Sequence, residues 1–486
     1  MKRILRFAAV VAVIGLLATS CSKKGEEGPS PQAGSLELTR NEGSAPYLVV
    51  VGQQLEIPYA AEHVGQLTCS TAEGWTIALS ETDGKVTLTP SLDAEQLASA
   101  FTLTLSGVDE KGEKVSSSVE VHLLDFADPK GVFVLNEGNM TTENGSLTYI
   151  SANGDIVADA YKLVNGTELG NVCQDLYIHD GKIYIISQNG GTNATGSSFR
   201  NDGMLVIADA RTLKLEKGFT AEDLSALSWP THIAVLDEQH VYIRTDSDNG
   251  GTTQQGVWRL DTTTGSLTFV ENTAGAPKNR MAVMGNKVYT TRGSGIVYIV
   301  EISADSDTGR KISLPFRSQI LNVNSGDNAG GIQASDDGQL WIMGSGSGKN
   351  YIHKYNLSDG SYVEKALAAT PKVAYNCPFA ASGNKIYYAS NTAVRCFDFD
   401  AATTEEADRQ LFDVYDFDAV SGNTLYNGLG LHPVTGDLYV NSIGDYTNYA
   451  TDNMIWVFSP SSTSQPQARY KGYTRFPAGF YFPAAF

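Results

Sequence analysis

The sequence has few of the residues on which metal centres and covalent catalysis depend. It holds 5 cysteines and 7 histidines in 486 residues, with neither the CxxC nor the HExxH spacing of a metal site. Cys377 and Cys396 are the only cysteines close in sequence, and their spacing by itself leaves a disulfide open. No Gly-rich phosphate loop follows a strand and opens a helix. We therefore expect no bound metal and no cofactor.

Positive charge is also scarce in this chain. The 35 lysines and arginines are outnumbered by 54 aspartates and glutamates, which gives a formal net charge of −19. Nucleic acids select basic surfaces, so the composition argues against a nucleic-acid partner. An acidic, soluble surface suits a protein that works outside the cell.

Long apolar runs are missing except near the start of the chain. Phe7–Leu17 follows a short basic segment and is shorter than the roughly 20 residues that a membrane-spanning helix needs. The layout predicts a signal peptide over residues 1–20. The segment "LLATSC", Leu16–Cys21, resembles a bacterial lipoprotein cleavage box, which implies lipidation of Cys21. A plain signal peptide with a chance cysteine is the alternative.

Residues 21–34 are polar and rich in glycine, proline and serine, which predicts a flexible tether. Glu26 and Glu27 are similar to the acidic surface-export signals of Bacteroidota lipoproteins. This similarity implies an outer-membrane lipoprotein that faces the cell exterior and contacts the membrane through its lipid anchor only. An ordinary solvated linker is the alternative.

Residues 35–127 predict a small β domain. Short apolar runs such as "WTIALS", "KVTLTP" and "FTLTLSGVD" alternate with turns, and no long helical pattern is present. We expect a β-sandwich of immunoglobulin type, with a smaller barrel as the alternative. No chemistry stands out in this segment, so its expected role is to hold the next domain away from the membrane.

Residues 128–486 contain a repeat of about 50 residues. Seven runs share a turn, an alternating pair, an aromatic residue and then polar residues. This recurrence, with several strands and little helix in each unit, predicts a seven-bladed β-propeller. The aromatic positions, separated by 51, 58, 47, 52, 46 and 52 residues, are Phe133, Tyr184, Tyr242, Tyr289, Trp341, Tyr387 and Tyr439.

The first of these units lacks an innermost strand of its own. The segment "RFPAGFYFP", Arg475–Pro483, has the character of an inner strand but no partner after it. We expect it to complete the first unit by pairing Phe480–Phe482 near Val132–Leu135, because closure removes the open edges of the end blades. The whole chain is thus predicted to be all-β.

One face of such a ring should carry the functional residues. The segments before each innermost strand and after the next strand converge on this face, and here they are rich in amides, aromatics and a few arginines. Polar turn residues are the plain alternative. The expected ligand-binding residues are Asn136, Glu137, Gln174, Asp175, Gln188, His232, Asp246, Asn279, Arg280, Arg292, Tyr375, Asn376, Tyr426, Asn427, Asn441, Arg475 and Phe476.

Catalysis is less well supported by the sequence. His232 is the only histidine near the predicted rim, and no GxSxG motif accompanies it. Glu137, Asp175 and Asp246 could supply a carboxylate pair for glycoside cleavage, but sequence does not set their separation. We therefore expect a binding protein, with no catalytic residues, rather than an enzyme.

Several segments together resemble a known group of proteins. They are "GVFVLNEGNMTTENGSLTYI", "LGNVCQDLYIHDGKIYIISQN", "YNGLGLHPVTGDLYVNS" and "TRFPAGFYF". They resemble a domain of unknown function in Bacteroidota surface lipoproteins, similar to the YncE-like propellers that include the BtuG-type lipoproteins. Those proteins capture cobalamin at the cell surface and pass it to a TonB-dependent outer-membrane transporter. The resemblance covers about residues 130–486.

The resemblance implies a lipid-anchored, monomeric surface protein that binds a small nutrient, such as a corrinoid, and delivers it to a TonB-dependent transporter. Two other interpretations stay open. One is a glycan-binding propeller or a lyase that acts on acidic polysaccharide, in which Arg280 and His232 would be required. The other is a scaffold for adhesion or protein interaction.

Overall fold

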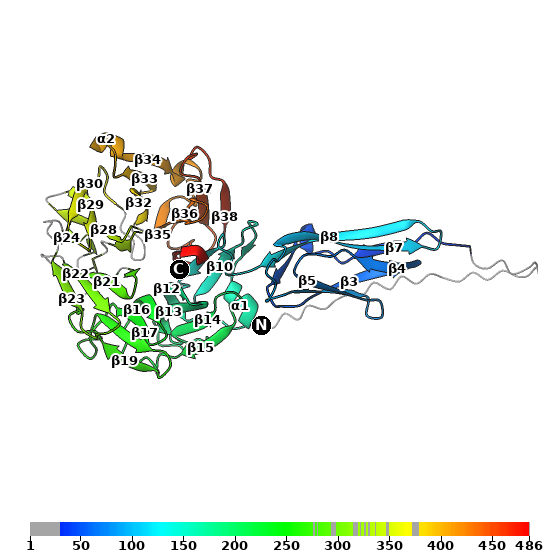
Figure 1. The fold of residues 1–486 in the computed structure, drawn as a ribbon, viewed down its shortest axis with the longest axis horizontal. Coiled ribbons are helices and arrows are strands. Elements are labelled where there is room, and N and C mark those ends of the chain that lie inside the picture. Colours follow the sequence, from blue (N-terminus) through cyan, green and yellow to red (C-terminus); the bar gives the residue numbers. More distant parts are fainter. Residues whose placement is uncertain are drawn as a thin grey trace, which may run out of the picture.

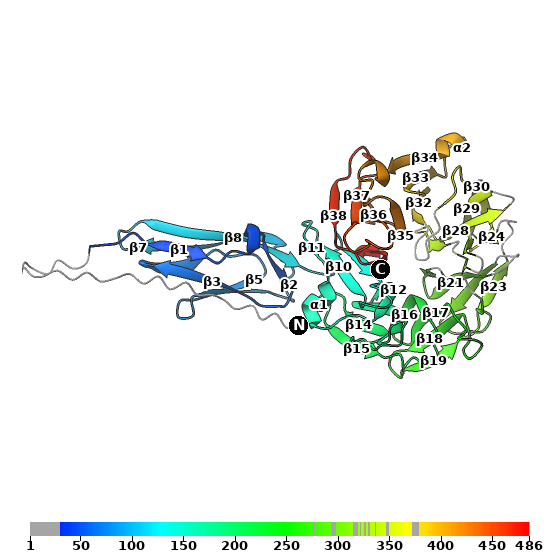
Figure 2. The same ribbon diagram turned by 180° about the vertical axis from the view of Figure 1, so that it is seen from behind.

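The structure is a computed structural model that describes residues 30–485 except for 276–277, 279, 293–297, 314–318, 321, 325–326, 329–330, 336, 347–348 and 372–378. In the described residues the chain is almost entirely β-structure, arranged in two regions (Figure 1). An elongated N-terminal region extends from one side of a ring of sheets, and Figure 2 shows the same arrangement from behind. None of the described helices is long and apolar enough to cross a membrane.

The N-terminal region consists of two four-stranded sheets packed on one apolar core. Alternate residues are buried along strands such as β7, because successive side chains of a strand point to opposite faces. One sheet has the order β1 (Ser35–Leu38), β3 (Leu55–Glu62), β6 (Lys85–Pro90) and β5 (Trp75–Ser80). The other has the order β2 (Tyr47–Val50), β8 (Lys114–Leu124), β7 (Ala100–Asp109) and β4 (Val64–Cys69).

The ring is built of antiparallel sheets that follow one another along the chain and around the ring (Figure 1). In the second, third, fourth, sixth and seventh sheets the strands run in sequence order from the inside of the ring outward. The second sheet is β12 (Asn171–His179), β13 (Lys182–Gly190), β14 (Leu205–Asp209) and β15 (Leu215–Phe219). The third is β16 (Pro230–Asp237), β17 (His240–Thr245), β18 (Val257–Asp261) and β19 (Ser266–Phe269). The fourth is β20 (Ala282–Met284), β21 (Lys287–Arg292), β22 (Tyr298–Ser303) and β23 (Arg310–Ser313).

The remaining sheets keep this plan, with short additions in the fifth. The fifth sheet joins β24 (Gln319–Ile320), β27 (Ile332–Ala334), β28 (Gln339–Gly346), β29 (Lys349–Asn356) and β30 (Tyr362–Ala366), beside a separate pair, β25 (Asn322–Asn324) and β26 (Asp327–Asn328). The sixth is β31 (Phe379–Ser382), β32 (Lys385–Ser390), β33 (Ala393–Asp398) and β34 (Asp408–Asp413). The seventh is β35 (Thr424–Leu431), β36 (Leu438–Ile443), β37 (Asn453–Phe458) and β38 (Ala468–Lys471).

The first sheet is completed by the end of the chain. It has the order β11 (Ile156–Val157), β10 (Ser146–Ile150), β9 (Val132–Asn136) and β39 (Pro477–Tyr481). The register pairs Phe480 with Val134 and Tyr481 with Phe133, so the expected pairing of the C-terminal segment with the first repeat is confirmed. The ring is therefore sealed by hydrogen bonds between strands more than 300 residues apart in sequence.

Helices are short and lie outside the sheets. The helix α1 (Ala160–Asn165) begins at Asp159, whose side chain accepts a hydrogen bond from the backbone N–H of Lys162. It ends at Gly166, which has a positive φ. The others are α2 (Thr404–Ala407) and the 3-10 turns η1 (Glu42–Ser44), η2 (Val414–Asp416) and η3 (Pro483–Ala485).

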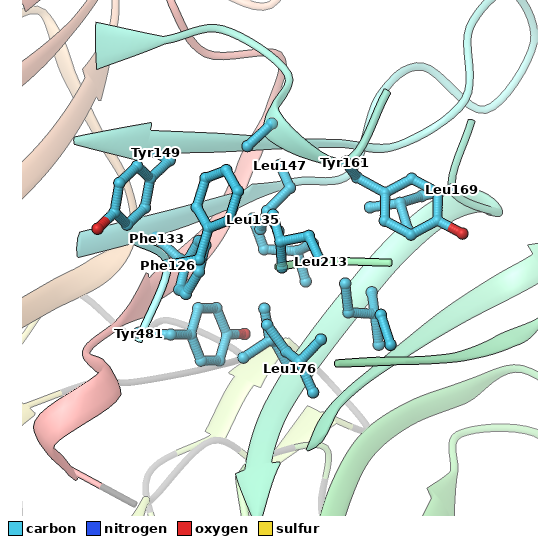
Figure 3. Packing of buried hydrophobic residues seen from close by; sticks show 14 of the residues in the cluster. Phe126, Phe133, Leu135, Leu147, Tyr149, Tyr161, Leu169, Leu176, Leu213 and Tyr481 are labelled. Atoms are coloured by element: carbon cyan, nitrogen blue, oxygen red, sulfur yellow. The ribbon is translucent and has the colours of Figure 1, made fainter. Parts of the chain in front are cut away.

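An apolar cluster joins the first and second sheets to the segment that leaves the N-terminal region (Figure 3). Phe126 from this segment is fully buried and packs edge-on against Tyr149, with ring centroids 4.8 Å apart. The Tyr149 hydroxyl donates a hydrogen bond to the carbonyl oxygen of Asp125 at 2.7 Å. The side chain of Asp125 also pairs with Arg211 of the ring at 2.9 Å. The two regions are thus joined by packing as well as by the chain.

Candidate functional site on the loop face of the ring

Three consecutive inner strands present polar residues at one equivalent position. Tyr177, Ala234 and Ala282 pair with the aromatic residues of the neighbouring strands β13, β17 and β21. Two residues before each of them the chain carries a polar side chain. Because residues two apart share a face of a strand, adjacent sheets bring these side chains to the same level of the ring. They are Asp175, His232 and Arg280.

These residues form one connected group with Tyr481, which we call the inner-strand network. Asp175 lies 3.2 Å from His232 (Oδ2 to Nδ1) and 3.4 Å from Arg280 (Oδ1 to Nη2). The Tyr481 hydroxyl donates to Asp175 Oδ1 at 2.8 Å, and the Arg280 guanidinium lies 4.5 Å from the centre of the Tyr481 ring. One carboxylate therefore links the first four sheets.

The charge states of the network follow from its burial and its partners. Burial would raise the pKa of Asp175, but Arg280, His232 and Tyr481 outweigh it, and the pKa is lowered. Burial lowers the pKa of His232, against the opposing effect of Asp175. A neutral His232 with a carboxylate at Nδ1 carries its proton on that nitrogen. Its Nε2 is a buried acceptor without a hydrogen-bond partner in the described part of the chain.

Glu137 directly follows β9, at the end of the first sheet where the inner strand begins. We call this end of each sheet its loop end, and the side of the ring that these ends form the loop face. Here Glu137 meets the seventh sheet. Its carboxylate accepts a hydrogen bond from Asn427 Nδ2 at 2.8 Å, and the side chain is partly exposed. Burial raises the pKa of Glu137 to about 7, against the opposing effects of Lys278 and Asn427. Lys278 Nζ also lies 3.9 Å from Asp246 Oδ2. Carboxylates from the first and third sheets therefore share one lysine.

Aromatic rings gather beside Glu137, in what we call the aromatic cluster. Phe476 stacks on Tyr449 with a centroid distance of 3.9 Å and lies 6.1 Å from Tyr446 and 5.6 Å from Tyr426. The Tyr449 hydroxyl donates to Glu143 at 2.8 Å, whereas Tyr446 is 68% exposed. The cluster thus offers a supported apolar surface with polar tips.

At or just before the start of three inner strands, one residue has an unfavourable backbone conformation. Val172, Trp229 and Phe476 have φ values of 57°, 51° and 52°. Each lies five residues before the strand residue that pairs with Tyr184, Tyr242 or Phe133. A bulky residue in this conformation costs roughly 1–3 kcal/mol and is concentrated at functional sites. Trp229 is nevertheless 51% exposed, so burial of its ring does not offset this strain.

Other residues expected to bind ligand instead hold the ring together. Asn136 donates to Ser146 Oγ at 3.2 Å and to Thr148 Oγ1 at 3.0 Å, and its Oδ1 accepts the backbone N–H of Arg475. The Arg475 guanidinium donates to three backbone carbonyl oxygens, with Ala450 at 3.0 Å. Asn136 and Arg475 therefore stabilise the seam at the C-terminal strand, while Glu137 pairs with Asn427 rather than with Arg475.

Three further amides from the predicted set are buried in the sheets. Gln174 in β12 and Gln188 in β13 are almost inaccessible. Asn441 in β36 is fully buried, and neither atom of its amide has a hydrogen-bond partner among the described residues. Asn279, Tyr375, Asn376 and the side chain of Arg292 lie outside the described residues, as do Cys21 and Cys377.

Sequence reasoning missed several residues of this face. Arg244 in β17 is buried and donates to Thr231 Oγ1 at 3.1 Å and Asp246 Oδ1 at 3.3 Å. Its signal was a charged residue inside the apolar run "QHVYIRT", whereas Lys278 and Trp229 have no comparable signal in the sequence. Among the described residues, no group of three or more His, Cys, Asp or Glu side chains is placed to hold a metal ion.

The solved structures that match this chain share little sequence with it. TolB from Acinetobacter baumannii is 14% identical (TM-score 0.36, covering 63% of this chain and 76% of that chain). A Lactobacillus plantarum protein is 12% identical (0.42, 73% and 99%). The dihydro-heme d1 dehydrogenase NirN, solved in complex with DHE, is 11% identical (0.41, 74% and 76%).

No curated protein matches the sequence. The family described as "Domain of unknown function (DUF5074)" matches residues 130–483, which is the whole of the ring from its first strand to its last. With its β-propeller-like, all-β fold, the chain belongs to the DUF5074 family.

Proposed function

We propose that the chain is a lipid-anchored protein of the outer membrane that faces the cell exterior. In this proposal Cys21 carries the lipid and residues 21–34 are the tether. Residues 35–127 are an immunoglobulin-like sandwich, and residues 128–486 are a seven-bladed propeller of the YncE-like and BtuG-like kind. The two packed sheets of the N-terminal region and the repeated four-stranded sheets of the ring support this architecture.

The loop face of the ring binds a small nutrient ligand, and a corrinoid is the first compound to test. The observation that carries this proposal is the aromatic cluster beside Glu137 and Asn427. A ligand with a flat apolar face and polar substituents could stack on Tyr446 or Phe476 while its polar groups meet the amide and carboxylate. The strained backbone at Phe476 supports the same conclusion, because such strain is found where a binding geometry is preformed.

Retention of cobalamin tests this proposal directly. The chain from residue 22 onward is incubated with cyanocobalamin and passed over a desalting column, and its visible spectrum is recorded. We expect retained corrinoid absorbance and a calorimetric affinity that falls about tenfold or more in Tyr446→Ala, because stacked aromatics carry much of the binding energy at such sites. Wild-type protein that elutes colourless would contradict a corrinoid ligand.

A matched control is available on the outer strand β30. Tyr362 is exposed like Tyr446 but follows the turn after β29, at the opposite end of the sheets. Tyr362→Ala should bind cobalamin as the wild type does. An equal loss of affinity in both variants would place the ligand elsewhere.

Delivery to a TonB-dependent transporter is the second part of the proposal and rests on the resemblance alone. Lipidated protein, solubilised from its native membrane with mild detergent, should co-purify with an outer-membrane transporter. The same protein with Cys21→Ser, which cannot be lipidated, should not. Isolation of the lipidated protein without any transporter would reject this part and leave ligand binding intact.

A further inference from the structure

A cavity of about 600 Å³ opens between the sixth and seventh sheets, on the same face as Glu137. It lies where β32 ends and β35 begins, at the loop ends of both strands. Its size is within the range of roughly 300–1,000 Å³ that is typical of small-molecule sites. Its polar lining residues are Thr370, Ser390, Asn391, Thr392, Asn423 and Thr424.

The described residues that line this cavity are polar or apolar but uncharged, on a protein whose formal net charge is −19. Other cavities formed by described residues include ionisable side chains. One contains Glu364 and Lys365, another Lys182 and Glu238, and a third Glu110. Hydroxyl and carboxamide groups both donate and accept hydrogen bonds, so this lining matches a neutral molecule with many hydroxyl groups.

Local hydrogen bonds hold the walls of the cavity in place. Ser390 Oγ donates to the carbonyl oxygen of Thr370 at 2.8 Å, and Asn423 Nδ2 donates to that of Gly444 at 2.8 Å. Asn391 has a φ of 54°, a conformation that asparagine tolerates better than most residues. The polar groups are therefore presented by a fixed framework, which reduces the entropy that a ligand would have to overcome.

An exposed aromatic residue follows a residue that is hydrogen-bonded to the lining of the cavity. The backbone N–H of Val414 donates to the carbonyl oxygen of the lining residue Thr392 at 3.2 Å. Tyr415, the next residue, is 48% exposed. An aromatic ring beside hydroxyl and amide groups matches a sugar, because one face of a pyranose ring presents C–H groups and its rim presents hydroxyls.

We propose that this cavity binds a neutral sugar unit of a glycan or glycoconjugate. The site goes beyond nutrient binding at the aromatic cluster, because it lies at a different seam and uses different residues. Hydroxyl and amide groups of the lining bind the sugar hydroxyls, and Tyr415 packs on the ring. Acidic sugars are disfavoured because the described lining residues include no cation with which to pair a carboxylate or sulfate.

The test begins with the chain from residue 22 onward on an array of neutral oligosaccharides and their uronate, sialylated or sulfated counterparts. Calorimetry then measures the affinity for the neutral compound with the strongest signal. We expect binding to neutral glycans and none to acidic ones. Absence of neutral binding, or a preference for acidic glycans, would overturn the proposal.

Two variants locate the bound sugar. Asn391→Gly removes the carboxamide and keeps the backbone conformation accessible, and Thr392→Val removes a hydroxyl with little change of shape. Each should weaken the affinity by about tenfold, since each removes hydrogen bonds to the ligand. Unchanged affinity in both would overturn the assignment to this cavity.

The matched control is Asn249→Gly, an exposed asparagine with a φ of 48° in the loop after β17. It should bind the neutral glycan within twofold of the wild type and unfold at the same temperature as Asn391→Gly. Retention of cobalamin should be the same in all three variants. Failure of the sugar site is therefore distinguishable from failure of the proposed nutrient site.

Discussion

The N-terminal region and the ring differ in what they bury. In the described residues of the N-terminal region, Asp109 is the only buried polar or charged residue, and the rest of its interior is apolar. The ring also buries apolar residues but adds Asp175, His232, Arg244 and Asn441. Buried polar groups cost free energy unless they are paired. The comparison therefore points to the loop face of the ring as the part of the molecule that is arranged for more than folding.

The position of these polar groups within the ring sharpens the comparison. All five residues of the inner strand β39 are buried. Of the buried polar groups in the ring, Asp175 and His232 lie toward the loop ends of the inner strands β12 and β16. The N-terminal sheets, by contrast, keep a regular alternation of buried and exposed residues. The apolar interior of the N-terminal region is thus typical of a scaffold, whereas the buried polar groups at the loop ends of the ring mark its candidate site.

Deletion of residues 475–486 should have the largest effect, and it should destabilise the ring but not the N-terminal region. The deletion removes β39 and exposes the edge of β9, whose five residues are all buried. We expect the ring to lose its cooperative unfolding transition while the N-terminal region keeps its own, because β39 does not contribute to that core. Calorimetry and circular dichroism measure both transitions. A ring that unfolds at the wild-type temperature would show that closure by β39 is not required.

The second largest effect is expected from Asp175→Asn. This change leaves Arg280 and the buried His232 without their carboxylate and should lower the free energy of unfolding by about 3 kcal/mol. Urea denaturation measures the loss. Asp109→Asn is the matched control in the N-terminal region, where the carboxylate accepts hydrogen bonds from backbone N–H groups such as that of Glu113 at 2.8 Å. If Asp109→Asn lowered the free energy of unfolding more than Asp175→Asn, the buried carboxylate of the N-terminal region would matter more for stability than that of the ring.

Glu137→Gln should change the pH dependence of stability. The pKa of Glu137 is raised to about 7 in the folded protein, so the folded state binds this proton more tightly than the unfolded state. Stability from this group is therefore present below about pH 4.5 and is lost as the pH rises through 7. At pH 8 the glutamine variant should be more stable than the wild type by about 2 kcal/mol, with little difference at pH 5.

Urea denaturation of both proteins at pH 5 and pH 8 measures this difference. A glutamine variant that is less stable at pH 8 would show that the carboxylate is held in its charged form. Cobalamin binding by the same variant then reports whether Glu137 also meets the ligand. Loss of affinity without loss of stability would place the carboxyl group in the binding site.

The smallest effect is expected at the joint between the two regions. Arg211→Ala removes the ion pair with Asp125 and a hydrogen bond to the carbonyl oxygen of Leu92. Because the pair is partly exposed, stability should fall by at most about 1 kcal/mol. Small-angle scattering should nevertheless show a broader range of distances between the regions. Lys214→Ala, an exposed change in the same turn, is the control and should leave both quantities unchanged.

The sequence predicted the strands of the ring better than the roles of individual residues. All seven repeat runs contain a strand, because the alternation of apolar residues and the turn residues are local signals. Because the first repeat lacks an inner strand of its own, the C-terminal segment could be predicted to complete it. That Asp175 and His232 are in direct contact could not be predicted, because it depends on the register of strands in separate sheets.

Asn136 and Arg475 illustrate the limit at the level of single residues. Both looked like ligand-binding residues because polar side chains at strand ends fit that role. In the structure their hydrogen-bonding groups are directed at the seam instead. Trp229 shows the converse, since its exposure and its backbone conformation, beside the register irregularity at the start of β16, are seen only in the structure. No property of the tryptophan in its sequence context predicts them.

The sequence by itself thus determined the all-β character, the repeat and the segment that closes the ring. Each depends on local hydrophobic patterning and on counting strands. Only the tertiary structure decided which polar groups meet, because the partners of Asp175 and Glu137 come from other sheets, as far as about 300 residues away in the chain. Hydrogen bonds and pKa values depend on distances of a few ångströms between such residues. Those distances are set by strand register and sheet packing, which no local pattern encodes.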